Sequence, residues 1–449
     1  MSSAKLLMVS LGCDKNLVDS ERMLSILADR GFELTDDETE AEVAVINTCC
    51  FIEDAKKESI EKIFDLARLK ETGKLKVLIA AGCMAQRYRE EILEEIPEID
   101  ALVGTAGIDD IAAAVDSALR GQKAVFTPDI NRDPKVVPGR RIVTTGGHYA
   151  YLKIAEGCDK HCTYCAIPSF RGSYRSFPEE DLVKEAEILA QRGDRELILV
   201  AQETTLYGTD LYGRKCLHEL LRKLCRIEDL RWIRILYCYP EDIYPELIDV
   251  MAEEEKICHY LDLPVQSGSD SVLKRMNRRT DTAQLAALVG ELREKIPDII
   301  LRTTLIEGFP GETEEEFEET VSFVRAMRFD RLGVFSYSRE EGTPAYSMKP
   351  QVPEKTAQER AGRLMEIQQE ISLELNENRI GSTVEVFVEG RIPEDDIYVG
   401  RTRGDAPQVD GFCFFRSDRT LMTGDFVNVK ITDASEYDLQ GEETDHECI

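Results

Sequence analysis

The sequence lacks the long apolar runs that mark membrane spans and secretory signals. No stretch of its 449 residues reaches the roughly 18 apolar residues from which a membrane-spanning helix is made. The opening segment, MSSAKLLMVSLGCDKN, has no apolar core of the length that a secretory signal requires. Repeats of solenoid length and low-complexity tracts are also absent. We therefore expect a cytoplasmic protein with no membrane partner.

Basic residues are scarce relative to acidic ones. Lys and Arg total 56, Asp and Glu total 86, and the formal net charge is -30 at pH 7. A surface of that sign repels the phosphate backbones of nucleic acids. The composition therefore favours a basic protein partner over a nucleic acid.

Histidine is also rare, with five residues and no paired ligand spacing, whereas the chain has 13 cysteines. Thiols stay reduced in the cytoplasm, so these cysteines are better explained as metal ligands, catalytic groups or small core residues than as disulfides. Their spacing has to decide between these roles.

The length and the apolar content of 43% suit two to four domains with their own cores. Within residues 1–125, the runs KLLMVSLG, EVAVINT and KVLIAAG are each followed by a helical pattern. Those helices are expected at 17–30, from about residue 53 and from about residue 87. This rhythm predicts an open parallel α/β domain.

Residues 126–147 are rich in Pro, Gly and charge, which predicts a linker. Six strand candidates follow within 148–377, most of them separated by helical stretches such as 178–192 and 281–295. Six such units predict an open, partial (β/α)6 version of the eight-unit barrel, with its chemistry at the C-terminal ends of the strands. The strands are AYLKIAE, ELILVAQ, RWIRILY, HYLDLPV, IILRTTLIEG and RLGVFSY.

One long helix is predicted from 353 to about 380, and Gly381 is a suitable stop. The segments STVEVFVEG and FVNVKIT then alternate apolar and polar residues with period two. Residues 378–449 are therefore expected to form a small antiparallel β-barrel.

The segment AEGCDKHCTYCAIP carries three cysteines, Cys158, Cys162 and Cys165, directly after the first strand of the predicted barrel. No fourth cysteine lies nearby, although structural metal sites usually close four protein ligands around the ion. A 4Fe-4S cluster bound by three thiolates keeps one iron free for a non-protein ligand. The alternative is a zinc site with a distant fourth ligand, His161 included, but zinc loops more commonly use paired CxxC units.

Three further cysteines follow the three strands of the N-terminal region. Cys13, Cys49 and Cys83 are far apart in the chain but should converge, because ligands gather at the carboxyl edge of a parallel sheet. Any one of them alone would be better explained as a small buried residue. Three in succession indicate a second site.

The CxxxCxxC loop, with Tyr164 just before its last cysteine, resembles that of the radical S-adenosylmethionine superfamily. The segments SLGCDKNLVDSE, INTCCFI and AAGCMAQR resemble the N-terminal domain of the methylthiotransferases. YAYLKIAEGCDKHCTYC, LRTTLIEGFPGETEEEF and FDRLGVFSYSREEGTPA resemble the RimO branch of that family. The resemblance covers nearly the whole chain and implies an enzyme that adds a methylthio group to the β-carbon of an aspartate in small-subunit ribosomal protein twelve.

The resemblance also implies the cofactors. Cys158, Cys162 and Cys165 would hold a 4Fe-4S cluster whose open iron is chelated by S-adenosylmethionine, the source of a 5′-deoxyadenosyl radical. Cys13, Cys49 and Cys83 would hold a second 4Fe-4S cluster whose open iron carries the inserted sulfur. S-adenosylmethionine would donate the methyl group, and a flavodoxin or ferredoxin would supply electrons. Contacts to S-adenosylmethionine are expected from Tyr164, Gln202, Glu203, Gln266, Arg302 and Gly308.

Several positions bear on the branch. The tRNA-modifying branch tends toward Gln-Met and Pro-Arg pairs where this chain has Asp14-Lys15 and Glu340-Glu341, whereas Ser267 fits the tRNA branch better. The alternative function is therefore methylthiolation of an adenosine in tRNA. A non-catalytic iron-sulfur electron carrier or scaffold is the alternative from another class.

Two positions depart from the family pattern in ways that concern geometry. Cys50 stands beside Cys49 where a small residue is more usual, and either thiol is able to bind. We assign Cys49 because it completes an Asn-Thr-Cys pattern. Gly146 stands where the branch commonly has proline.

The C-terminal segment resembles a TRAM domain, a module that would grip RNA in the tRNA branch. Residues 381–449 hold 16 Asp and Glu against 6 Lys and Arg. Such a barrel should repel tRNA and attract a basic ribosomal protein, so nucleic acid is expected only through the ribosome. The alternative is an acidic surface kept for solubility. Glu394, Asp395 and Asp396 are the first charges to test.

Overall fold

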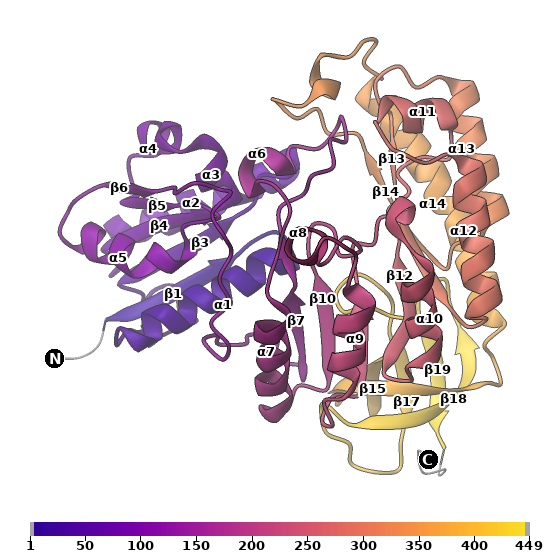
Figure 1. Cartoon of the computed structure of the whole chain (residues 1–449). Coiled ribbons are helices and arrows are strands. Elements are labelled where there is room, and N and C mark those ends of the chain that lie inside the picture. Colours follow the sequence, from indigo (N-terminus) through magenta and orange to yellow (C-terminus); the bar gives the residue numbers. More distant parts are fainter. Residues whose placement is uncertain (1–3, 445–449) are drawn as a thin grey trace.

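A computed structural model describes residues 4–444, in which three units follow one another along the chain (Figure 1). The first is a parallel six-stranded sheet in the order β2-β1-β3-β4-β5-β6. Its strand β3 is buried along its whole length, as expected for a strand with both faces covered. One apolar cluster lies under α1 and α5, and another lies under α2, α3 and α4 on the other face. The elements are β1 (Lys5–Ser10), α1 (Asp14–Asp29), β2 (Glu33–Leu34), β3 (Val43–Thr48), α2 (Glu53–Thr72), β4 (Val77–Gly82), α3 (Cys83–Tyr88), α4 (Glu90–Glu95), β5 (Ala101–Val103), α5 (Ile111–Leu119) and β6 (Ala124–Phe126).

The third predicted helix of this unit begins earlier than the pattern indicates. The sequence pattern predicts a helix from about residue 87, but α3 begins at Cys83, directly after β4. The helix is interrupted at Arg89, whose φ is +45°. The early start places the Cys83 thiol in the first turn of a helix. Strands β5 and β6 are three residues each, too short to produce a period-two signal.

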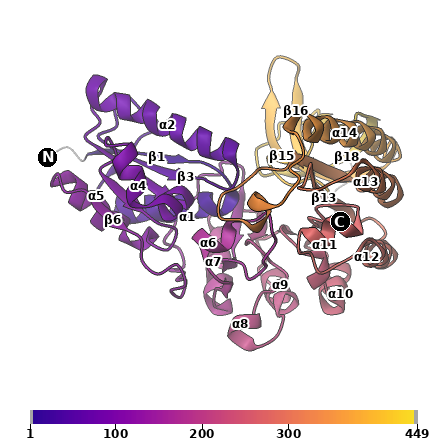
Figure 2. The same cartoon turned by 90° about the horizontal axis from the view of Figure 1, so that it is seen from above.

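The six predicted strands of the central region form a parallel sheet in chain order, open between β7 and β14. Its outer face packs against the surrounding helices through the largest apolar cluster of the molecule, and helices α7 and α9 to α14 lie around that face (Figure 2). The strands are β7 (Tyr149–Lys153), β10 (Glu196–Val200), β11 (Trp232–Ile235), β12 (Ile257–Asp262), β13 (Ile300–Glu307) and β14 (Arg331–Ser336). The helices are α7 (Glu179–Gln191), α8 (Thr209–Tyr212), α9 (Leu217–Cys225), α10 (Pro245–Glu253), α11 (Asp270–Arg275), α12 (Thr282–Lys295), α13 (Glu314–Met327) and α14 (Glu354–Glu377).

The C-terminal unit is a closed five-stranded barrel, β15-β16-β17-β19-β18. Its pairs are antiparallel as predicted, except that β17 and β19 run parallel. The loop joining β15 and β16 projects from the molecule (Figure 2). The strands are β15 (Thr383–Ile392), β16 (Ile397–Thr402), β17 (Cys413–Arg416), β18 (Phe426–Ala434) and β19 (Leu439–Glu443).

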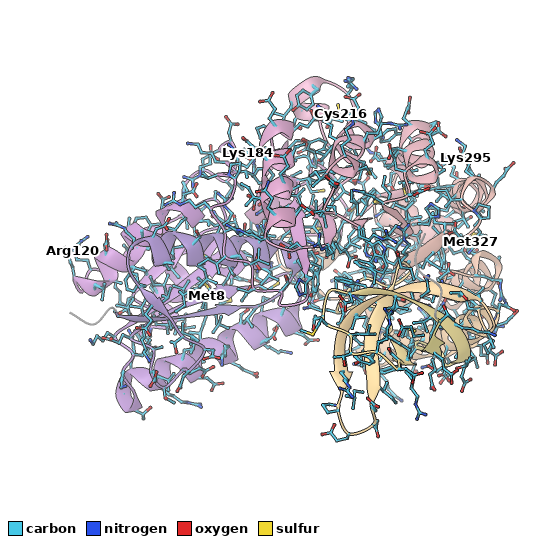
Figure 3. The ribbon with its side chains drawn as sticks, turned by 90° about the horizontal axis from the view of Figure 1, so that it is seen from below. Met8, Arg120, Lys184, Cys216, Lys295 and Met327 are labelled. Carbon is cyan, nitrogen blue, oxygen red and sulfur yellow. The ribbon has the colours of Figure 1, made fainter. Side chains whose placement is uncertain are left out.

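The C-terminal barrel is attached to the central unit by buried charges. Glu196 of β10 is fully buried, and it accepts hydrogen bonds from Arg234 Nε at 2.8 Å and from Arg401 Nη2 of β16 at 2.6 Å. Asp405 pairs with Arg331 of β14 at 2.9 Å. The contact covers part of the base of the central strands, as the view from below shows (Figure 3).

Among residues 4–444, every helix is either too short or too polar to cross a bilayer.

Replacing Arg401 by Met should loosen the C-terminal barrel. Glu196 would lose one of its two buried partners, and breaking a buried ion pair in this way costs about 3 kcal/mol. Trp232 is the only tryptophan of the chain, and it packs against Phe387 and Phe426 of the C-terminal barrel. Its fluorescence during urea unfolding should therefore change at a lower urea concentration in the Arg401→Met protein.

Arg391→Met is the matched control. Arg391 pairs with Asp396 in the same barrel, but the two side chains are 47% and 72% exposed. Its loss should change stability by less than about 1 kcal/mol. An unchanged Trp232 transition in Arg401→Met would contradict the role given to Glu196.

Candidate functional site

The CxxxCxxC loop begins where the first barrel strand ends. Strand β8 (Ala155–Glu156) pairs with β9 (Arg175–Ser176), so the base of the loop is closed. Gly157 has a φ of +78°, and a Cβ at this position would lie 2.0 Å from the carbonyl oxygen of Ser173. Only glycine fits so close an approach at a positive φ. The loop therefore starts from a fixed backbone position.

The rest of the loop is held by two distant segments. Thr163 N donates to the Met276 carbonyl at 3.0 Å, and Ala345 N donates to the Thr163 carbonyl at 2.9 Å. Within the loop, Cys165 N donates to the Cys162 carbonyl at 3.1 Å. These bonds bring the loop against residues that follow the fourth and sixth barrel strands.

The three thiols of the loop are close together and shielded from water. Cys158 and Cys162 are buried and Cys165 is half-buried. Burial raises the pKa of Cys158 to about 12 and also raises the pKa of Cys165, and the neighbouring Cys162 adds to both effects. Such thiols stay protonated near neutral pH unless a cation binds the sulfur and displaces the proton.

A buried cationic and aromatic group, which no sequence pattern indicated, lies beside Cys162. The Tyr239 hydroxyl is 3.8 Å from Cys162 Sγ, and the Arg278 guanidinium is 4.4 Å from the centre of the Tyr239 ring. Arg278 also pairs with Glu241 at 2.8 Å. Tyr164 packs in the adjoining apolar cluster. A cation placed here favours negatively charged sulfur in the loop.

Glu203, just after β10, offers an unused acceptor next to the loop. The side chain is fully buried, and burial raises its pKa to about 8. In its ionised form, Glu203 adds to the rise that burial causes in the pKa of Cys158. Its Oε1 accepts the Thr205 N–H at 2.9 Å, but its Oε2 is buried without a hydrogen-bond partner among residues 4–444. An orphaned buried acceptor is costly, so the site fits a ligand that brings a positively charged donor.

The other predicted contact residues lie in different settings. Gln202 Oε1 accepts the Gly157 N–H at 2.9 Å, which places it under the loop. Gln266 has a φ of +75° and bonds through its backbone to β13. Arg302 is engaged by Asp262 at 3.1 Å and lies 3.5 Å from Asp410 of the C-terminal unit.

Gly308 is explained by packing. A Cβ at this position would lie 2.3 Å from the Cβ of Ala357 in α14. Its N–H donates to Glu312 Oε2 at 2.9 Å. The glycine thus allows α14 to approach the end of β13.

The N-terminal cysteines occupy one edge of the first sheet. Cys13 precedes α1, Cys49 follows β3 and Cys83 begins α3, and the preceding strands β1, β3 and β4 are neighbours. A Cβ on Gly12 would lie 2.7 Å from the Cβ of Cys49, and Asn16 Oδ1 is 3.6 Å from Cys83 Sγ. The structure therefore brings the three thiols to the predicted carboxyl edge.

Cys49 and Cys50 point to different surroundings. Cys50 is fully buried in the apolar cluster that includes Ile63 and Leu66, beside the Arg87 guanidinium, and burial raises its pKa to about 12. Cys49 instead lies against Gly12, the residue before Cys13. The assignment of Cys49 stays a prediction, because Cys50 also lies close enough to Cys83 to add to the rise that burial causes in the pKa of the Cys83 thiol.

A short helix connects the two cysteine sites. Helix α6 (Ile167–Arg171) begins two residues after Cys165, and Phe170 packs into the N-terminal core. At its end, Arg171 Nε donates to Cys83 Sγ at 3.3 Å. In Figure 1, α6 lies between the first sheet and the central unit. Sequence patterns predicted neither this helix nor its contact.

The donor sets fit iron-sulfur clusters better than single ions. No three His, Cys, Asp or Glu side chains in the described part of the chain converge tightly enough for one ion. A 4Fe-4S cluster binds each thiolate through a different iron, so its ligands need not meet at one point. Three shielded thiols at each site, one set beside a buried guanidinium, are suited to that arrangement.

Three family models match successive parts of the chain. Residues 5–104 match the uncharacterized protein family UPF0004, residues 152–324 match the radical SAM superfamily, and residues 380–443 match the TRAM domain.

Curated relatives match over nearly the whole length. The ribosomal protein uS12 methylthiotransferase RimO of Lachnoclostridium phytofermentans is 57% identical over 437 residues, which covers 97% of this chain and 99% of that protein. The protein of the same name from Thermoanaerobacter sp. is 48% identical over 436 residues, covering 97% and 98%. Among solved structures, the radical S-adenosylmethionine methyltransferase TsrM of Kitasatospora setae has a TM-score of 0.56 at 16% identity, covering 85% of this chain and 78% of that one. That likeness is one of fold.

Replacing Cys49 by Ser should remove iron from the protein, whereas Cys50→Ser should not. If each site holds one 4Fe-4S cluster, Cys49→Ser loses about four of about eight irons per chain after anaerobic reconstitution. Iron and sulfide analysis with the visible absorption spectrum measures this. Iron loss in Cys50→Ser with full iron in Cys49→Ser would reverse the assignment.

Proposed function

This chain belongs to the RimO family of ribosomal protein uS12 methylthiotransferases, and on that premise we propose that its two cysteine sites divide one reaction between them. The protein is a radical S-adenosylmethionine enzyme that transfers a methylthio group to ribosomal protein uS12. We place the new group on the β-carbon of one aspartate. The observation that supports the division of labour best is the pair of three-cysteine sites, each at the carboxyl ends of parallel strands, joined by α6.

In this proposal Cys158, Cys162 and Cys165 hold one 4Fe-4S cluster, and Cys13, Cys49 and Cys83 hold a second. When bound, the clusters and S-adenosylmethionine supply a carbon-centred radical that abstracts hydrogen, and the methyl and sulfur of the inserted group. The protein has to position these groups and keep water away from them. The proposed reaction also needs an outside one-electron donor, a flavodoxin or ferredoxin, to reduce the radical-generating cluster.

We propose the following roles for residues around the CxxxCxxC loop. The free Oε2 of Glu203 would accept a hydrogen bond from the amino group of S-adenosylmethionine. Gln202 fixes the backbone of Gly157 at the start of the loop. Arg278 and Tyr239 hold positive charge and a hydroxyl close to the Cys162 sulfur. We also keep Tyr164, Gln266, Arg302 and Gly308 as proposed neighbours of the cofactor.

We propose that the domains divide at the boundaries that the sequence indicates. These are an N-terminal methylthiotransferase domain (1–125), a linker (126–147), a radical S-adenosylmethionine core (148–377) and a TRAM domain (378–449), of which residues 1–3 and 445–449 lie outside the described residues. The reaction on a ribosomal protein is placed in the cytoplasm.

The acidic C-terminal barrel is proposed to dock the basic substrate, but only part of its charge is available for that. Glu385, Glu389, Asp405 and Asp410 are engaged by residues of the central unit or by Arg401. Glu394, Asp395 and Asp396 are exposed on the projecting β15–β16 loop, where Asp396 forms an exposed ion pair with Arg391. This loop is therefore the part of the barrel best suited to attract Lys and Arg side chains.

The substrate is tested directly by offering both polymers. Reconstituted protein, S-adenosylmethionine and a reductant are incubated with uS12 or with unmodified tRNA, and each product is weighed. We expect uS12 to gain one methylthio group in place of one hydrogen, at an aspartate, and tRNA to remain unchanged. Modified tRNA together with unmodified uS12 would contradict the proposal and favour the alternative function, methylthiolation of tRNA.

A parallel reaction with Cys162→Ala separates the enzyme from an electron carrier. Because this change removes one ligand of the radical-generating cluster, 5′-deoxyadenosine should no longer form. Intact S-adenosylmethionine in the presence of the reduced, unsubstituted protein would favour a non-catalytic iron-sulfur protein.

Reversing three charges of the β15–β16 loop should weaken substrate binding. In the variant Glu394→Lys, Asp395→Lys, Asp396→Lys, we expect KM for uS12 to rise about tenfold at low salt with little change in kcat, because rim charges act mainly on encounter. The difference should shrink as added salt screens the charges.

The control reverses three exposed charges elsewhere, Glu91→Lys, Glu94→Lys and Glu95→Lys in α4. In Figure 1 this helix lies on the side of the molecule away from the C-terminal barrel. An equal rise of KM in both variants would mean that net charge, and no docking site, attracts uS12.

A further inference from the structure

The buried side chain of Arg171 makes more hydrogen bonds than a single salt bridge would need. It is 2% exposed. Its Nη1 donates to Asp19 at 2.9 Å and to Glu156 at 3.1 Å, and its Nη2 donates to the Asn16 side chain. The N–H on Nε is directed at Cys83 Sγ, 3.3 Å away. One guanidinium thus joins α1, β8 and the second cysteine site.

Stability alone does not account for this arrangement. Lys153 already pairs with both Asp19 and Glu156, at 2.8 Å in the case of Glu156. A buried ion network is rarely more stabilising than apolar side chains of the same volume. A neutral thiol is also a weak acceptor, whereas a thiolate accepts a charge-assisted hydrogen bond. The Nε–H of Arg171 is therefore matched to a negatively charged sulfur at Cys83.

We propose that Arg171 is a positioning residue that ties the radical-generating loop to the second cluster and raises the reduction potential of that cluster through its hydrogen bond to Cys83. Reduction adds negative charge to a cluster, and a buried cation with a hydrogen bond to its sulfur stabilises the reduced form. The inference rests on the proposed function only in taking Cys13, Cys49 and Cys83 as cluster ligands.

The connection between the cysteine loop and Arg171, helix α6, is short and stiff. Helix α6 has five residues, which advance about 7.5 Å along the helix axis. Its C-terminal part is fixed to the first unit, because Thr105 Oγ1 donates to the Phe170 carbonyl at 2.6 Å. A displacement of the loop at Cys165 would therefore be transmitted to Arg171 and Cys83.

The reduction potential of the second cluster tests the proposal. The background variant Cys158→Ala, Cys162→Ala, Cys165→Ala isolates that cluster, and a redox titration followed by electron paramagnetic resonance gives its midpoint. Adding Arg171→Met should lower the ratio of reduced to oxidised cluster at a given potential about tenfold, a shift of about 59 mV to more negative values for one electron. Arg171→Lys keeps the charge and should recover part of the shift.

Arg141→Met in the same background is the matched control. Arg141 is also a buried arginine between the first and central units, where it pairs with Glu21 at 2.5 Å and donates to the Tyr151 carbonyl. Its replacement should destabilise the protein without moving the potential. An unchanged potential in Arg171→Met with the cluster retained, or an equal shift in Arg141→Met, would overturn the proposal.

A second measurement leaves position 171 intact, in case Arg171→Met does not fold. The background variant is produced with ¹⁵N-arginine, and pulsed electron paramagnetic resonance on the reduced cluster should detect one coupled arginine nitrogen. The coupling should disappear in Arg171→Lys. Its absence from the background variant would overturn the proposal.

Failure of the proposed function gives a different result. If uS12 is not methylthiolated but the potential shift and the nitrogen coupling are found, the role of Arg171 stands and the substrate assignment falls. If uS12 is methylthiolated and neither signal is found, the proposed function stands and the role given to Arg171 falls.

Discussion

The relation between the two cysteine sites depends on one buried ion network. Arg171 and Lys153 carry two positive charges, Asp19 and Glu156 carry two negative charges, and each of these side chains is at most 10% exposed. Charges so deeply buried must keep their partners, because an unpaired one would cost several kcal/mol. The network therefore fixes how the first sheet faces the central one, and with it how one cysteine site faces the other.

The C-terminal barrel is held by the same kind of interaction. Glu196 is shared between Arg234 and Arg401, and Asp405 pairs with Arg331. Part of the acidity of this barrel is thus structural, and only part remains on the surface. The net charge of the segment, read from the sequence alone, therefore overstates the charge that is available for contact with a partner.

Much of the fold was predictable because its signals are local. The six central strands, α7, α12 and α14 follow from period-two and helical patterns within single segments. Strands β5 and β6 were missed because three residues carry no periodicity. Helix α3 was placed too late because it begins directly after β4, with Gly82 as an N-cap that has no side chain to signal the start. The parallel β17–β19 pair was missed because pairing direction is a long-range property.

The sequence by itself determined the number and spacing of the cysteines, the open parallel sheets that would bring them together, and the family. The tertiary structure decided that Cys50 packs in the apolar core while Cys49 lies against Gly12, and that Arg171 reaches Cys83. It also decided that one oxygen of Glu203 has no hydrogen-bond partner among the described residues. The physical reason is that these properties are set by burial and by partners far away in the chain. Asp19 and Arg171, which form one ion pair, are 152 residues apart. No local sequence pattern indicates which charged side chain will contact which cysteine once the two sheets have packed together.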